Sequence, residues 1–166
     1  SFLHVPVSTD RNLNIKNNIY GYDVILNQLK DAKQVLNNNN PEKIFTIGGG
    51  CGVEVPILSY LANKYADFDV FWFDAHGDLN TPFSSPSNYY HGMPLRFLLE
   101  DIKNSEISKL IYNINPNNLF MIGLRDLDDE EIKYIKENKI KIIAIDEINT
   151  LGNRIKKGRY GYIHID

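Results

Sequence analysis

Three residues that could bind a metal ion stand two positions apart in the segment Asp74-Ala75-His76-Gly77-Asp78. If the segment is extended, alternate side chains lie on one side of it, and two carboxylates and an imidazole can then face the same ion. Oxygen ligands with some nitrogen suit a divalent cation such as Mn²⁺. A polar loop with capping aspartates is the alternative. The preceding apolar run Phe71-Trp72-Phe73 favours the metal, because burying three ionisable groups without a partner is costly.

The elements that must position these residues are short apolar runs that alternate with helical stretches. Strands are expected at 44–47, 70–73, 119–122, 140–145 and 162–165, and helices at 20–36, 53–65, 94–102 and 128–137. The strand runs are apolar throughout, as is typical of a parallel sheet that is covered on both faces. The alternation of strands and helices predicts a three-layer α/β/α fold with a mainly parallel sheet.

Polar or special residues follow four of the five predicted strands. Three glycines and Cys51 follow the first run, Asp74 the second, the segment 123–128 the third, and Asp166 the last. Open α/β sheets bind their ligands beyond the carboxyl ends of the strands. We therefore expect the site to lie along that edge of the sheet.

Composition limits the classes of protein to which the chain could belong. The 166 residues are 43% hydrophobic and carry a net charge of −3, which favours a globular domain and gives no reason to expect nucleic acid or a membrane as partner. A single cysteine excludes an internal disulfide and fits a reducing, cytoplasmic location. The start without Met and the end on an apolar run predict that residues 1–166 form one partial domain, truncated at both ends.

Four motifs together resemble the arginase (ureohydrolase) family, which includes arginase, agmatinase and formiminoglutamase. The segment 74–82 (DAHGDLNTP) resembles the family's D-A-H-x-D-x-N metal motif, and 91–95 (HGMPL) resembles its H-G-x-P-x segment. The segment 123–128 (GLRDLD) resembles G-L-R-D-x-D, and 163–166 (IHID) resembles the start of S-x-D-x-D-x-x-D-P. The motifs stand in the family's order, and the segment 91–95 with the serines of 85–87 favours arginase within the family.

The resemblance implies a hydrolase that converts arginine to ornithine and urea, by means of a hydroxide held between two Mn²⁺ ions. It implies that Asp74 and Asp166 bridge the ions, that Asp78 serves one ion and takes part in catalysis, and that His76 serves the other. His91 would shuttle protons. The small guanidino substrate would be bound by Asn80, Ser85, Ser87, Asp128 and Glu131.

Cys51 is the main departure from the family pattern. It stands where the G-G-D-H segment of arginases has a metal-binding histidine, and Gly50 replaces the aspartate. A thiolate at this position would favour zinc or iron over manganese, whereas a small buried cysteine would bind nothing. Two Mn²⁺ ions are expected in a complete protein, and one or none in this chain. We expect Cys51→His to raise manganese occupancy.

Two further functions stay open. An agmatinase or formiminoglutamase type of hydrolase would share the metal motif, and a catalytically silent homologue would explain Cys51. A homo-oligomer is compatible with each of these readings. His4 and His164 have no supporting context in the sequence, and we expect them to be structural or surface residues.

Overall fold

The main sheet is parallel and has four strands. The computed structural model describes residues 2–100, 102, 105–155 and 158–166. Across the sheet the strand order is β5-β4-β3-β6, and every neighbouring pair is parallel. The strands are β3 (Phe68–Phe73), β4 (Leu119–Ile122), β5 (Lys141–Ile143) and β6 (Tyr160–Ile165). The predicted mainly parallel α/β sheet is therefore confirmed.

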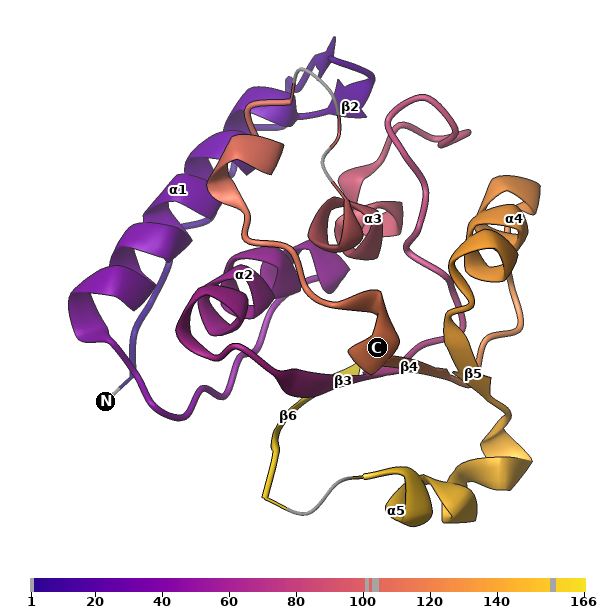
Figure 1. Ribbon diagram of the computed structural model, residues 1–166. Coiled ribbons are helices and arrows are strands. Elements are labelled where there is room, and N and C mark those ends of the chain that lie inside the picture. The colour runs from indigo at the N-terminus through magenta and orange to yellow at the C-terminus, as the bar shows by residue number, and fades with distance from the viewer. Residues whose placement is uncertain (1, 101, 103–104, 156–157) are drawn as a thin grey trace.

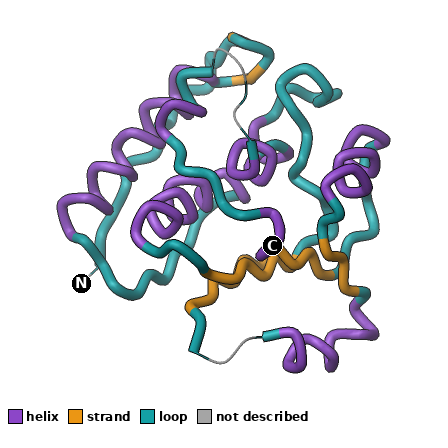
Figure 2. Tube along the Cα trace, in the orientation of Figure 1, coloured by secondary structure: helices purple, strands orange, loops and turns teal. Residues whose placement is uncertain are grey.

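Helices lie on both faces of this sheet. Figure 1 shows α5 (Leu151–Arg154) on one face and the larger helical layer on the other, and Figure 2 shows the same layers by type of structure. The larger layer contains α1 (Tyr22–Asn39), α2 (Glu54–Lys64), α3 (Pro94–Leu99) and α4 (Asp129–Asn138). A hairpin of β1 (Ile15–Lys16) and β2 (Ile19–Tyr20), which the sequence did not predict, precedes α1.

Alternation along the strands divides the core between the two faces. Val70 and Trp72 of β3 belong to the larger hydrophobic cluster, which the helices α1 to α4 cover. Phe71 of β3 belongs to a smaller cluster, against which Leu151 of α5 packs. Because successive side chains of a strand point to opposite faces, an unbroken apolar run covers both. The predicted reason for these runs is thus confirmed for β3.

The run 44–47, for which we expected a strand, is not a strand. Phe45 and Ile47 are 90% and 83% exposed. An apolar run becomes a strand when a neighbouring strand accepts its hydrogen bonds and a second layer buries its side chains. Among the described residues this run has neither, and β6 forms the edge of the sheet. The prediction of a first strand at this position is wrong.

The ends of the other elements differ from prediction by a few residues. The helix expected at 94–102 ends at Leu99, because Glu100 takes up an extended conformation. The strand expected at 140–145 is limited to three residues, and a 3-10 turn at Ile145–Thr150 follows it. None of the helices in the described part of the chain is long and apolar enough to cross a membrane.

Candidate metal centre

The pairing of β3 with β6 brings two aspartates to the same edge of the sheet. Trp72 pairs with His164, and Phe73 pairs with Ile165. Asp74 and Asp166 come directly after this second pair, one on each strand. The Asp166 amide donates to the Phe73 carbonyl at 3.0 Å. Strand alternation then places the side chains of His164 and Asp166 on one face. This is the face that Trp72 lines, and it lies under the larger helical layer.

Four buried side chains gather at this edge. Cys51, Asp74, Asp78 and His164 each offer one potential ligand atom, and these atoms all lie within 4.8 Å of one another. We call them the four-donor cluster. The Cys51 thiol lies 3.7 Å from Asp74 Oδ2 and donates to Asp166 Oδ2 at 3.3 Å. The structure therefore brings together four of the five residues that the sequence predicted as metal ligands, with His164 in addition.

The chemistry of the four-donor cluster fits a divalent cation. Asp78 is 3% exposed, and its Oδ2 has no hydrogen-bond partner among the described residues. Leaving a buried carboxylate oxygen without a partner is costly, and a bound cation removes that cost. Burial, together with the charge of Asp74, raises the pKa of Asp78 to about 7. Burial, followed by the charge of Asp78, also raises the pKa of the Cys51 thiol.

The segment from Asp74 to Asp78 is bent, whereas we expected it to be extended. The chain bends at Ala75 and His76, and Asp78 has a left-handed backbone with a φ of 53°. His76 consequently lies outside the four-donor cluster, with 60% of its side chain exposed. Its Nδ1 lies 3.2 Å from Asp74 Oδ1, and its Nε2 lies 3.8 Å from Asp126 Oδ2.

Asp74 lies between two imidazoles. Its Oδ1 accepts the His76 backbone amide at 2.9 Å and contacts the His76 ring, while its Oδ2 lies 3.6 Å from His164 Nε2. Burial opposes ionisation of Asp74, but the contacts with His164 and His76 outweigh it and lower the pKa of Asp74 to about 2. The two oxygens of one carboxylate thus face two different sides of the site.

His164 is buried inside the site. We expected a structural or surface residue, and the sequence analysis did not place His164 among the residues of the site. Its Nδ1 lies 3.4 Å from Oε1 of Glu54 at the start of α2, and its ring stacks on Trp72 with centroids 3.7 Å apart. The spacing of two between His164 and Asp166 was the available signal, because it puts both on one face of the strand. His4, by contrast, is exposed as expected.

The charge of His164 gives the metal-free protein an expected pH dependence. Burial opposes protonation, but Asp74 and Glu54 outweigh it and raise the pKa of His164 from 6.5 to about 9. The resulting stability is fully present below pH 6.5 and is lost as the pH rises to 9, with a change in unfolding free energy of at most about 3 kcal/mol. Urea denaturation of chelator-treated wild type and His164→Gln across this range measures it. Equal pH dependence in both proteins would refute it.

The predicted substrate-binding residues Asn80 and Asp128 meet beside the cluster. Asn80 is buried, donates to Asp128 Oδ2 at 2.7 Å, and accepts a hydrogen bond from Ser84 at 2.8 Å. Ser85 and Ser87 accept backbone amides within their own loop, at 3.1 and 3.3 Å. In this structure these polar groups fix the loop 80–89, a role that the sequence reasoning did not assign to them.

His91, the predicted proton shuttle, is exposed on a short 3-10 turn at Tyr90–Gly92. Its ring lies 5.8 Å from the ring of Tyr89, centroid to centroid, and His91 is not part of the four-donor cluster. The backbone of this turn is tied to the metal motif, because the Asn80 amide donates to the Gly92 carbonyl at 3.1 Å. The structure thus attaches the turn that carries His91 to the loop after Asp78.

Glu131 has a structural position, whereas we expected it to bind substrate. Its side chain is buried, and its two oxygens accept the backbone amides of Leu79 and Asp128, both at 2.9 Å. A carboxylate whose two oxygens are occupied in this way holds the segment after Asp78 against the start of α4. Glu131 therefore has a positioning role in this structure, and its contact with substrate stays a prediction.

Glu131→Gln is expected to lower the unfolding free energy by about 1–3 kcal/mol, because one of the two buried amides loses its acceptor and meets an NH₂ group. Glu130→Gln is the matched control, because the Glu130 side chain is 60% exposed and loses only its 3.8 Å ion-pair contact with Lys133. Urea denaturation of both variants checks the difference. Equal stabilities would show that the two amide contacts contribute nothing.

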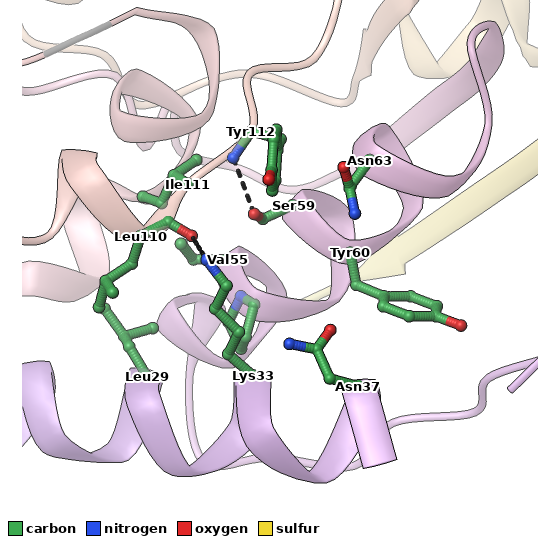
Figure 3. A pocket seen from close by; sticks show the side chains of 11 residues that line it. Leu29, Lys33, Asn37, Val55, Ser59, Tyr60, Asn63, Leu110, Ile111 and Tyr112 are labelled. Carbon is green, nitrogen blue, oxygen red and sulfur yellow. Dashed lines mark hydrogen bonds between the residues drawn. The ribbon is translucent and has the colours of Figure 1, made fainter. Parts of the chain in front are cut away.

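A small cavity of about 80 Å³ lies away from this cluster, between α1, α2 and the segment 110–112. Figure 3 shows two hydrogen bonds across it: Lys33 donates to the Leu110 carbonyl at 2.8 Å, and the Tyr112 amide donates to Ser59 at 2.9 Å. None of the predicted site residues lines it. The predicted site residues therefore lie away from this cavity.

Known proteins match this chain over most of its length. A family model described as "Arginase family" matches residues 3–159. A protein of Staphylococcus aureus (strain MRSA252) named arginase is 37% identical over 144 residues, which cover 82% of this chain and 46% of that protein. An arginase of Bacillus subtilis (strain 168) is 36% identical over 154 residues, which cover 89% of this chain and 51% of that protein.

The fold also matches a solved structure. The crystal structure of arginase from Bacillus subtilis superimposes with a TM-score of 0.71 and 32% identity, over 89% of this chain and 50% of that one. The chain thus spans about half the length of the curated relatives it matches.

Proposed function

Because the chain belongs to the arginase family, we propose that the protein is a metal-dependent hydrolase that releases urea from a guanidino compound. The observation that carries the proposal is the four-donor cluster at the carboxyl end of the parallel sheet. Arginine, which would yield ornithine and urea, is the first substrate to test, because the two curated relatives described above are both named arginase.

We propose Mn²⁺ as the cofactor, held on two sides of Asp74. Cys51, Asp78 and Asp166 would serve the side that faces Asp74 Oδ2, and His76 the side that faces Oδ1. When bound, such ions lower the pKa of water and thereby supply a nucleophile at neutral pH. The buried Asp78 carboxylate would be stabilised most by the ion, because its Oδ2 has no hydrogen-bond partner among the described residues.

The polar groups beside the cluster would orient the substrate. Asp126 and Asp128 are exposed at the edge next to His76 and Asn80, and their negative charge favours a cationic guanidino compound. His91, exposed and tied through its turn to Asn80, would carry protons between the site and water. A cytoplasmic location and a homo-oligomeric state also remain predictions.

Urea release is the direct test of the proposal. Purified protein is assayed with arginine and with agmatine, after chelator treatment and after return of Mn²⁺. We expect urea from arginine only when Mn²⁺ is present. Release from agmatine alone would favour the agmatinase type of hydrolase. No release from either compound, together with no retained metal, would favour the catalytically silent homologue that Cys51 suggests.

A further inference from the structure

We infer that His164 is a metal ligand, and that it supplies the cation on the Cys51 side with the imidazole that Cys51 does not provide. This inference rests on the proposed metal-dependent function and concerns the same centre. It gives a role to a histidine that none of the family motifs in the sequence assigns to metal.

The first support is the position of a buried ring whose Nε2 points at the cluster. His164 is 4% exposed, and neither ring nitrogen makes a hydrogen bond to the described residues. Nε2 has only a 3.6 Å contact with Asp74 Oδ2, and His164 belongs to the group of donors that lie within 4.8 Å of one another, with Cys51 and Asp78. A buried ring nitrogen without a hydrogen bond is costly, and a bound cation would remove that cost.

The second support is the carboxylate on the other ring nitrogen. Glu54 is buried, and its Oε1 lies 3.4 Å from His164 Nδ1, while its Oε2 accepts the hydroxyl of Tyr162. Histidines that bind metal usually donate their second N–H to a carboxylate, which fixes the ring and raises its basicity. Glu54 therefore has the place of an orienting partner, and it leaves Nε2 directed at the cluster.

The ring is also held in one plane before any ion binds. The Trp72 indole is fully buried and stacks on the His164 ring at 3.7 Å between centroids, with 22° between the planes. Trp72 and His164 are paired residues of neighbouring strands, so the sheet itself sets this contact. A ligand fixed on a rigid strand loses little conformational freedom when it binds.

The two departures from the family motifs meet at this point. Cys51 stands at the histidine of G-G-D-H, and His164 stands at the serine of S-x-D. In the fold both belong to the four-donor cluster, so an imidazole that is missing on one side of the cluster is replaced on another. It follows that Cys51→His would add a second imidazole to a buried, packed position, where overpacking is destabilising. We now expect little gain from Cys51→His alone.

Metal affinity distinguishes a His164 that binds the ion from a His164 that stays protonated and does not bind it. The affinities for Mn²⁺ and Co²⁺ are measured by equilibrium dialysis for wild type, His164→Ser and His4→Ser, the last an exposed histidine that serves as control. If His164 binds the ion, His164→Ser is expected to weaken binding by at least about 10–100-fold. Loss of a residue that only supports a ligand already costs that much. His4→Ser should bind as wild type does. Unchanged or tighter binding by His164→Ser would overturn the inference.

A second measurement uses the wild-type protein and does not depend on how the variant folds. In protein labelled with ¹⁵N-histidine, added Zn²⁺ should shift the Nε2 resonance of His164, while that of His4 stays in place. With four histidines in the chain, single variants of the other three assign the signal. A His164 resonance that does not respond to saturating Zn²⁺ would overturn the inference.

Urea release tests the proposed function, and the metal-binding measurements test the role of His164, so either can fail without the other. Metal-dependent urea release by wild type, with no effect of Zn²⁺ on the His164 resonance, would leave the hydrolase standing and refute the role of His164. A shifted resonance in wild type and weakened binding in His164→Ser, without urea release from wild type, would support His164 as a ligand and refute the hydrolase.

The double substitution of Cys51→His with His164→Ser adds a rescue test. It restores one imidazole, so the double variant should bind Mn²⁺ more tightly than His164→Ser.

Discussion

Asp74→Asn is expected to lower the affinity for Mn²⁺ by more than about 100-fold and to abolish urea release, because loss of a ligand should exceed the 10–100-fold cost of losing a supporting partner. The two oxygens of Asp74 face different sides of the site: Oδ1 contacts His76, and Oδ2 contacts His164 and Cys51. A neutral amide in this position removes negative charge from both sides at once. It would also present an NH₂ group to a place that now offers only acceptor oxygens.

The measurement is metal content after dialysis, followed by the urea assay at saturating Mn²⁺. Asp31→Asn, on the exposed side of α1, is the matched control and should behave as wild type does. Wild-type affinity in Asp74→Asn would contradict the proposed centre. A loss of activity with unchanged metal binding would mean that Asp74 acts on the substrate and not on the ion.

The position of the site could be predicted from the sequence because it depends on strand ends. The apolar run Phe71-Trp72-Phe73 predicted a buried strand, which the structure has, and Asp74 follows it directly. The same reasoning placed Asp166 at the end of the last strand, and the parallel register of β3 and β6 sets the two residues side by side. Apolar runs report burial, so they predict strands well wherever a second layer exists. They failed at 44–47, where none of the described elements covers Phe45.

The composition of the four-donor cluster could not be predicted in full, because it depends on contacts across the sheet. His164 is far from Asp74 along the chain and reaches it only through the pairing of β6 with β3. Glu54 stands on a helix, and nothing in its local sequence shows that it faces an imidazole. Spacing within one segment was also misleading, since a positive φ at Asp78 turns the chain and separates His76 from the cluster.

Glu131 shows a different limit of sequence reasoning. The family resemblance implied that Glu131 binds substrate, but its position three residues after Asp128, at the start of α4, lets it accept the backbone amide of Asp128. Its other oxygen accepts the Leu79 amide from a distant segment. A carboxylate near a site is thus free for substrate only if the backbone has not already used it, and this is visible only in the fold.

Trp72→Ala is expected to have the largest effect on stability, with a loss of about 3–5 kcal/mol of unfolding free energy. Trp72 is completely buried in the middle of β3, so its removal leaves a large cavity that the paired strands on both sides cannot close. Phe83→Ala, at a side chain that is 80% exposed, is the control and should change stability little.

Trp72→Phe separates packing from the support of His164. Phenylalanine keeps an aromatic face under the imidazole, which now stacks on the indole at 3.7 Å, and it leaves a smaller cavity than alanine. The indole Nε1 has no hydrogen-bond partner among the described residues, so its loss adds no unpaired group. We therefore expect Trp72→Phe to lose less stability than Trp72→Ala and to keep near wild-type affinity for Mn²⁺. Urea denaturation measures the stability, and equilibrium dialysis measures the affinity for Mn²⁺. Equal losses of Mn²⁺ affinity in Trp72→Phe and Trp72→Ala would show that the stacked ring does not support the site.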